Sequence, residues 1–174
     1  MTDTDFYVES DKLERVAHGF DAARNDYSSN LWNVSIKPNI ASGGGGLVST
    51  ISDYAKFSQM LLNRGHLDGK ILLSPKTIDF MLSNHLTDNL IDQDEYYLPQ
   101  TGYGFGLGVA VRLEDGKAHS AGSQGDFRWG GAAGTAFWID PKEELILLFM
   151  VQHIGSSYHL RERFKALVYQ AIIE

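Results

Sequence analysis

The sequence predicts an α+β fold, because three patterns follow one another along the chain. Apolar residues recur at helical spacing over 49–62 and 74–84, and then alternate with small or polar residues over 105–113 as in a β-strand. A continuously apolar run at 144–152 and an amphipathic stretch at 161–172 complete the series. Helices and strands that are segregated in this way favour α+β, with about three antiparallel strands, a C-terminal helix on the sheet and two or more further helices.

Length and composition set broad limits on function. The chain has 174 residues, a hydrophobic fraction of 43% and a net charge of −7, from 15 basic and 22 acidic residues. It is large enough for one domain with a core, and it has no basic cluster of the kind that nucleic acid or an anionic membrane attracts. The absence of cysteine excludes disulfides and thiolate catalysis. We expect no nucleic-acid partner and no membrane span, because the longest apolar run, 145–151, is too short to cross a bilayer.

The first 47 residues predict an irregular lead-in. A short helix is expected over 12–20 and a polar loop over 21–39, and the polar, acidic residues 1–5 do not resemble an export signal. The sequence gives no prediction of the cellular location of the protein. Four glycines at 43–46 favour a tightly packed turn over a flexible tether, because a strongly patterned helix follows at once.

Two helices are expected in residues 48–100. The first starts at Ser49 or Thr50, with Asp53 in a capping arrangement, and Gly65 suits the left-handed position that ends it. The second starts at Ser74, a good N-cap followed by a proline, and runs to about residue 84.

Residues 101–174 predict a sheet and a closing helix. We expect one strand over 105–113, a second over 135–139 and a third over 144–152, the last buried on both faces. The closing helix has an apolar face comprising Phe164, Leu167, Val168, Ala171 and Ile172. Its other face carries Arg161, Glu162, Arg163 and Lys165.

An ordered set of short motifs connects the chain with a known family. These are the glycine run and helix start at 43–50, the Leu-Leu-Ser-Pro at 72–75, the Tyr-Gly-Phe-Gly-Leu-Gly-Val at 103–109, and 129–135 leading into the Trp-Ile-Asp-Pro at 138–141. In this order they resemble the serine β-lactamase-related family, which includes class C β-lactamases, DD-peptidases and β-lactamase-like carboxylesterases. The resemblance covers the whole chain and implies the C-terminal part of the β-lactamase-like fold.

The resemblance implies a place for the family's third active-site motif, which is Lys-Thr-Gly in lactamases and Trp-x-Gly in many esterase-like members. Here it falls on Trp129, Gly130 and Gly131, with the backbone N–H of Ala132 as an oxyanion donor. Small residues let such a donor approach a substrate carbonyl closely. Trp129 stands where lactamases carry a cation, which favours an ester or amide substrate. Taken without the family context, a Trp-Gly-Gly beside a strand is more often a packing feature.

The family's nucleophile is missing from the sequence. No serine has a lysine three residues on, and the only match to the family's Tyr-x-Asn or Tyr-x-Ser element, at 27–29, lies in a polar stretch and is more simply explained by chance. In the family both elements precede a segment like residues 1–6. We therefore expect residues 1–174 to be a single partial domain, divided into 1–47, 48–100 and 101–174.

Two functions follow from this reading. In the first, the chain is part of a serine hydrolase for an ester, amide or β-lactam, is inactive alone, and needs no cofactor or metal, because its six histidines are scattered. His119 and His153 are the two histidines that could border the active-site groove, which the resemblance places beside the third motif. In the second, the chain is a non-catalytic binding or interaction domain. In either case the apolar strand at 144–152 loses a pairing partner, which predicts a homodimer formed through that edge, an exchange of elements between copies, or cover by the chain's own N-terminal residues.

Overall fold

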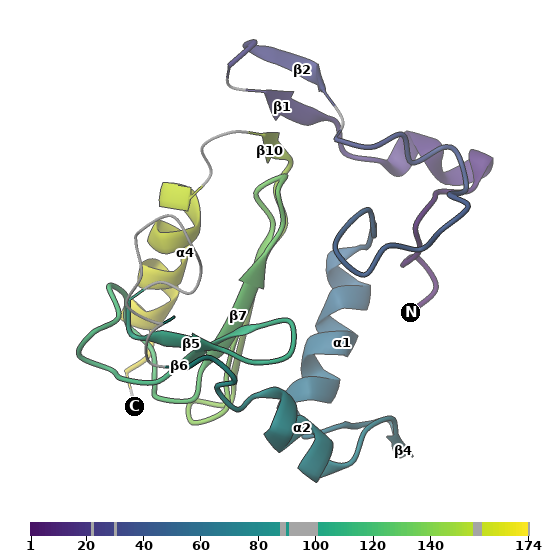
Figure 1. Cartoon of the computed structure of the whole chain (residues 1–174). Helices are drawn as coiled ribbons and strands as arrows, with labels where there is room; N and C mark the ends of the chain where they lie inside the picture. Colours follow the sequence, from purple (N-terminus) through teal and green to yellow (C-terminus); the bar gives the residue numbers. More distant parts are fainter. Residues whose placement is uncertain (22, 30, 88–89, 91–100, 155–157, 174) are drawn as a thin grey trace.

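The structure is a computed structural model that describes residues 1–21, 23–29, 31–87, 90, 101–154 and 158–173. A five-stranded sheet stands between helix α4 (Tyr158–Gln170) on one side and helix α1 (Ile51–Leu62) on the other (Figure 1). Its strands are β5 (Tyr103–Phe105), β6 (Ala110–Arg112), β7 (Phe127–Gly130), β8 (Ala136–Asp140) and β9 (Leu145–Phe149). The α+β class is thereby confirmed.

The sheet is a simple antiparallel meander in the order β5-β6-β7-β8-β9, so it has five strands and not about three. The single strand predicted over 105–113 is wrong, because that segment is a hairpin in which Phe105 pairs with Ala110. Gly106 donates its N–H to the carbonyl of Val109 at 2.8 Å, and Gly108 turns the chain at a φ of +90°. Glycines at alternate positions imitate a strand pattern while supplying the left-handed conformation that a turn requires.

Side chains of the sheet alternate between two cores. Phe137, Ile139 and Ile146 face α1 and join a cluster around Met60 and Leu61 of that helix. Trp138 and Leu147 face the other way and pack against Phe164 and Val168 of α4. The period of two that a β-strand imposes thus divides β8 and β9 between the two helices.

The predicted helix in the middle of the chain is confirmed in detail. Thr50 caps α1 by accepting the N–H of Asp53 at 3.3 Å, and Gly65 follows the helix at a φ of +98°. After a small hairpin of β3 (His66–Leu67) and β4 (Lys70–Ile71), Ser74 caps α2 (Pro75–Met81), as expected. The side chain of Asp53 also accepts the N–H of Asp3 at 2.8 Å, which fixes the start of the chain to α1.

The lead-in contains more structure than the sequence indicated. A 3₁₀ helix spans Ser10–Arg15, and the residues expected to be helix and loop include β1 (Gly19–Asp21) and β2 (Asp26–Ser29). β1 pairs in parallel with β10 (His153–Ile154), a contact between distant segments that no local pattern encodes. The predicted tight packing of the glycine run is also wrong, because Gly43, Gly44 and Gly45 are exposed.

The orientation predicted for the closing helix is wrong at several positions, of which two differ most. Lys165, placed on the solvent face, is fully buried, and Leu167, placed on the apolar face, is 62% exposed. The physical reason is that the sheet offers a carboxylate beneath Lys165, so a cation is the residue that this position requires. β9 is the last strand of the sheet within the described residues, and its side chains pack alternately into both cores. Over the same residues, no helix has the length and apolar character needed to cross a membrane.

Candidate functional site

The predicted third motif lies at the end of β7, the central strand of the sheet. Trp129 pairs with Phe137 and Gly130 pairs with Ala136 on β8, while the other edge of β7 pairs with β6. β7 is paired on both sides at Phe127 and Arg128 and continues with β8 alone through Gly130, and this pairing fixes its register. The residues that follow it, 131–134, form a turn whose position is therefore set by the centre of the sheet.

Trp129 points to the α1 side of the sheet and is half-buried there. Its ring meets the ring of Phe105 edge-on, with centroids 5.0 Å apart, and it packs against the core that α1 covers. Trp129 therefore contributes to packing and also keeps part of its surface accessible. An indole in this position presents apolar area and brings no charge with which to bind a carboxylate.

The two glycines of the motif are required by contacts within the protein. A Cβ on Gly130 would lie 2.8 Å from Nη1 of Arg161, and one on Gly131 would collide with the hydroxyl of Thr135. Sequence reasoning explained these glycines by the approach of a substrate. The structure adds that they leave room for the side chains of Arg161 and Thr135 beside the turn.

The turn is pinned through its backbone at several points. Gly131 donates its N–H to the carbonyl of Thr135 at 2.8 Å, and Gly134 donates to the carbonyl of Gly131 at 3.1 Å. The N–H of His153 reaches the carbonyl of Ala133 at 2.6 Å. Ala132 is exposed, and within the described part of the chain its N–H has no hydrogen-bond acceptor. The turn therefore presents one unused backbone donor on a fixed frame.

Arg161 is the residue near this turn that sequence reasoning missed. It was placed on the solvent face of α4, but its Nε donates to the carbonyl of Gly134 at 3.0 Å and its Nη2 donates to the carbonyl of Gly131. The available signal was the spacing of Arg161, Lys165 and Tyr169, which recur every four residues and so share one face of a helix.

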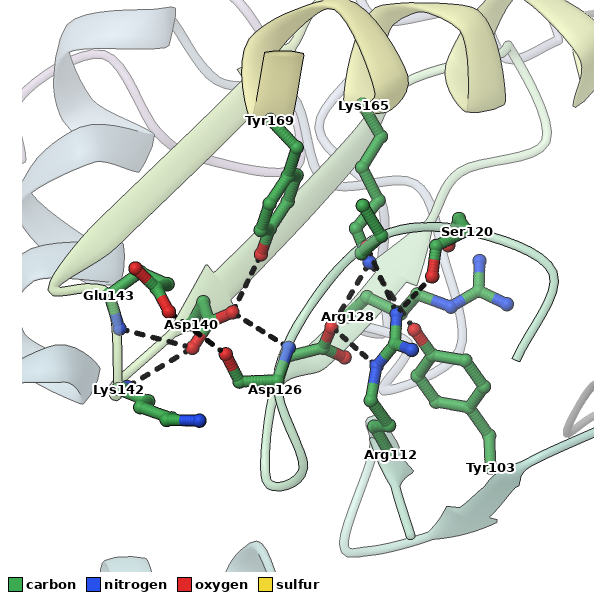
Figure 2. Close-up of polar contacts among 12 residues, drawn as sticks. Tyr103, Arg112, Ser120, Asp126, Arg128, Asp140, Lys142, Glu143, Lys165 and Tyr169 are labelled. Atoms are coloured by element: carbon green, nitrogen blue, oxygen red, sulfur yellow. Dashed lines mark hydrogen bonds and ion pairs between the residues drawn. The ribbon is translucent and has the colours of Figure 1, made fainter. Parts of the chain in front are cut away.

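A buried ionic cluster lies between α4 and the sheet (Figure 2). The Oδ2 atom of Asp126 accepts from Nε of Arg112 at 2.9 Å and from Nζ of Lys165 at 3.0 Å, and all three side chains are fully buried. Lys165 also donates to the hydroxyl of Tyr103 at 3.3 Å. The guanidinium of Arg128 lies over the Tyr103 ring at 4.7 Å. The carboxylate of Asp126, which immediately precedes β7, thus links that strand to β6 and to α4.

The electrostatics of this cluster follow from burial and from Asp126. Burial lowers the pKa of Lys165 below its usual range, even though the neighbouring carboxylate opposes that change. Burial also raises the pKa of the Tyr103 hydroxyl, and Asp126 adds to the effect. These groups are well suited to holding α4 on the sheet, and they lie on the side of β7 opposite to Trp129.

A second buried carboxylate, Asp140, ties the end of β8 to the end of α4. Tyr169 donates its hydroxyl to Asp140 at 2.7 Å, and the N–H groups of Ser123 and Lys142 donate to it at 3.0 and 3.1 Å (Figure 2). Burial alone would raise the pKa of Asp140, but the hydrogen bond from Tyr169 and the backbone donors outweigh it and hold that pKa below its usual range.

The two histidines singled out in the sequence lie in different settings. His153 reaches the turn through its backbone, and its buried Nδ1 has no hydrogen-bond partner among the described residues, whereas the side chain of His119 is exposed. Among the residues that the structure describes, no group of three or more histidine, aspartate and glutamate side chains lies close enough together to hold a metal ion.

Solved structures share this fold. Unliganded simvastatin synthase (LovD) from Aspergillus terreus matches with a TM-score of 0.73 and 27% identity over 98% of this chain and 46% of its own. Its selenomethionyl derivative gives a TM-score of 0.76 at 25% identity, over 100% and 47% of the two chains. EstCE1, a hydrolase with promiscuous acyltransferase activity, has a TM-score of 0.70 and 20% identity over 94% and 45%, which shows a common fold. The chain thus has the C-terminal part of the β-lactamase-like fold.

The sequence comparisons identify the family. The Beta-lactamase family model matches residues 1–170, and the chain belongs to that family. Protein Rv1367c of Mycobacterium tuberculosis strain H37Rv and the uncharacterized protein MT1414 of strain CDC 1551 are each 37% identical to it over 162 residues. These matches cover 88% of this chain and 40% of each relative, so the chain spans 40% of the length of the curated relatives that it matches.

Proposed function

We propose that this chain supplies the third-motif strand and one oxyanion donor of a serine hydrolase or acyltransferase that acts on an ester, amide or β-lactam. The observation that carries the proposal is the N–H of the exposed residue Ala132, which has no acceptor among the described residues and lies on a pinned turn after the central strand. Trp129, Gly130 and Gly131 form the end of that strand and the start of the turn.

The chemistry requires such a donor. When a serine attacks an acyl group, negative charge develops on the former carbonyl oxygen, and a backbone N–H that is already in place stabilises it without reorganisation. One donor of this kind contributes about 3–4 kcal/mol to the transition state. The turn at 131–134 meets the requirement because its position is fixed by hydrogen bonds that do not involve the Ala132 N–H.

The substrate class follows from Trp129. The indole brings apolar surface and no positive charge to this position, which favours an ester or amide over a substrate that is held by its carboxylate. Simvastatin synthase, 27% identical to this chain, is named as a synthase, and this supports including a bond-forming transfer beside hydrolysis.

The nucleophile in this proposal comes from outside residues 1–174. No serine of the sequence is followed by a lysine at the third position, and serine activation in this family depends on that pair. The share of the curated relatives that the chain spans, 40%, supports a longer functional unit. We accordingly propose that these 174 residues form a single partial domain and have no hydrolytic activity alone.

Two observations test the proposal. The 174-residue chain is incubated with p-nitrophenyl butyrate and with a fluorescent fluorophosphonate, and we expect no turnover above buffer and no labelled serine. The DNA upstream of the Met1 codon is then read for an in-frame Ser-x-x-Lys, which we expect to find. Stoichiometric labelling of the chain alone would contradict its inactivity, and an upstream region without the motif would favour a non-catalytic binding domain.

The open edge of β9 favours a second role, which is self-association. β9 pairs with β8 on one side only within the described residues, and an unpaired apolar edge is a template for another strand. We propose a homodimer formed through residues 144–152. Light scattering across a micromolar dilution series should show a mass that falls with dilution, and a constant monomer mass with a cooperative thermal transition would exclude the dimer.

A further inference from the structure

The guanidinium of Arg161 holds both ends of the turn that follows the third motif. It donates through Nη2 to the carbonyl of Gly131 and through Nε, at 3.0 Å, to the carbonyl of Gly134. The contact is partly buried and joins α4 to a segment about 30 residues earlier in the chain. Gly134 donates its own N–H to the carbonyl of Gly131, so this carbonyl oxygen accepts from two groups at once.

The carbonyl of Gly131 and the N–H of Ala132 belong to the same peptide unit. A trans peptide is planar, and its C=O and N–H point in opposite directions. Because Arg161 binds the carbonyl from the side of α4, the N–H of Ala132 is directed to the opposite side. A side chain that never touches the oxyanion position therefore determines where the donor points.

The charge of Arg161 acts on the same peptide unit. A cation at a carbonyl oxygen draws electron density from the nitrogen, and hydrogen bonds that share a peptide group strengthen one another. The N–H of Ala132 is consequently a stronger donor than it would be if a neutral group or water bound the Gly131 carbonyl.

We propose that Arg161 is a positioning residue that orients the N–H of Ala132 and increases its donor strength by binding the carbonyl of Gly131. The catalytic meaning of this inference rests on the proposed function, in which Ala132 is an oxyanion donor. Gly130 is part of the same device, because a Cβ there would lie 2.8 Å from Nη1 of Arg161 and would displace the guanidinium.

Hydrogen exchange of the Ala132 amide tests the proposal in the 174-residue chain. Base-catalysed exchange removes the proton from the Ala132 nitrogen and leaves an anion whose charge is shared between that nitrogen and the carbonyl oxygen of Gly131, so a cation at that oxygen accelerates exchange. The amide has no acceptor within the described residues, and its exchange therefore reports its acidity and not an opening step. We expect Arg161→Gln to slow exchange at Ala132 about tenfold, which corresponds to one unit of amide acidity.

The sign of the change separates this role from a merely structural one. Loss of packing would leave exchange at Ala132 unchanged or make it faster, and either result in Arg161→Gln would overturn the proposal. Arg161→Lys retains a charge and should stay within about threefold of the native rate. The matched control is Arg163→Gln, an exposed arginine on the same helix, which should leave the rate unchanged.

Gly130→Ala reaches the same contact from β7 and keeps the proposal testable if the Arg161→Gln chain does not fold. It should also slow exchange at Ala132, and a native rate would again contradict the proposal. In a polypeptide that carries the serine, Arg161→Gln should lower kcat for p-nitrophenyl butyrate with KM unchanged. If Arg161→Gln slows exchange at Ala132 but the serine-carrying polypeptide has no esterase activity, only the proposed function is contradicted. If that polypeptide is an active esterase but Arg161→Gln leaves exchange at the native rate, only this inference is contradicted.

Discussion

Both faces of the central sheet have an apolar core, but the α4 side adds buried carboxylates with charged and polar partners. We call the α1 side the apolar face and the α4 side the polar face. On the α1 side, Leu61, Phe127 and Ile139 belong to a buried apolar core. On the α4 side, Asp126 and Asp140 receive hydrogen bonds from charged and polar groups of the helix and the neighbouring strands. The apolar face depends on volume, whereas the polar face depends on particular partners at particular distances.

This difference bears on the candidate site. Arg161 belongs to the polar face and binds the turn that carries Ala132, so the interactions that orient α4 also orient the candidate donor. An apolar contact constrains distance with little regard to direction, but a bidentate guanidinium fixes both. The face with the stricter geometry is thus the one that holds the backbone of the third motif.

The largest expected effect comes from a substitution that breaks the ionic cluster on the polar face. Asp126→Asn leaves Arg112 and Lys165 buried without their carboxylate and should lower the free energy of unfolding by about 3–5 kcal/mol. Urea titration of both proteins measures the loss. Asp79→Asn, which affects an exposed pair with Arg64, is the control and should cost less than about 1 kcal/mol. Equal losses in the two variants would contradict the account.

The next effect tests the apolar face. Leu61→Ala should cost about 2–5 kcal/mol, because it opens a cavity beneath α1. Leu61→Met conserves volume and should cost less than about 1.5 kcal/mol by the same urea titration. If the methionine variant were as unstable as the alanine variant, this face too would depend on specific geometry.

A smaller effect distinguishes the two faces by how the cost of a substitution depends on pH. Tyr169→Phe removes a hydrogen bond to Asp140 and should cost about 1–2 kcal/mol at pH 7. Since the folded pKa of Asp140 lies below its usual value, the stability it adds is present above about pH 4, the pKa of the unfolded chain, and is lost as pH falls through the folded pKa.

The cost of Tyr169→Phe should therefore shrink between pH 7 and pH 3, as measured by urea titration at each pH. The cost of Leu61→Ala should remain the same over that range, because no titrating group is involved. A loss in Tyr169→Phe that does not depend on pH would show that its hydrogen bond to Asp140 contributes little.

The features that could be predicted from the sequence are those encoded locally. Thr50, Gly65 and Ser74 carry their own capping and turn chemistry, and each lies where the sequence predicted it. The features that could not be predicted depend on distant partners. Lys165 looks like a solvated residue until Asp126, 39 residues earlier, is placed beneath it. Of the candidate site, the resemblance predicts the motif at residues 129–131, whereas the contact between Arg161 and the turn required the fold.

The most direct test of the central claim is the kcat for p-nitrophenyl butyrate of a polypeptide that joins this chain to the Ser-x-x-Lys segment that we propose. Ala132→Pro removes the backbone N–H and should lower kcat about 10²–10³-fold, whereas Ala132→Gly keeps the N–H and should retain most of the activity. Thermal transitions within a few degrees of one another would show that both variants fold. Equal kcat values for the two variants would contradict the assignment of Ala132 as an oxyanion donor.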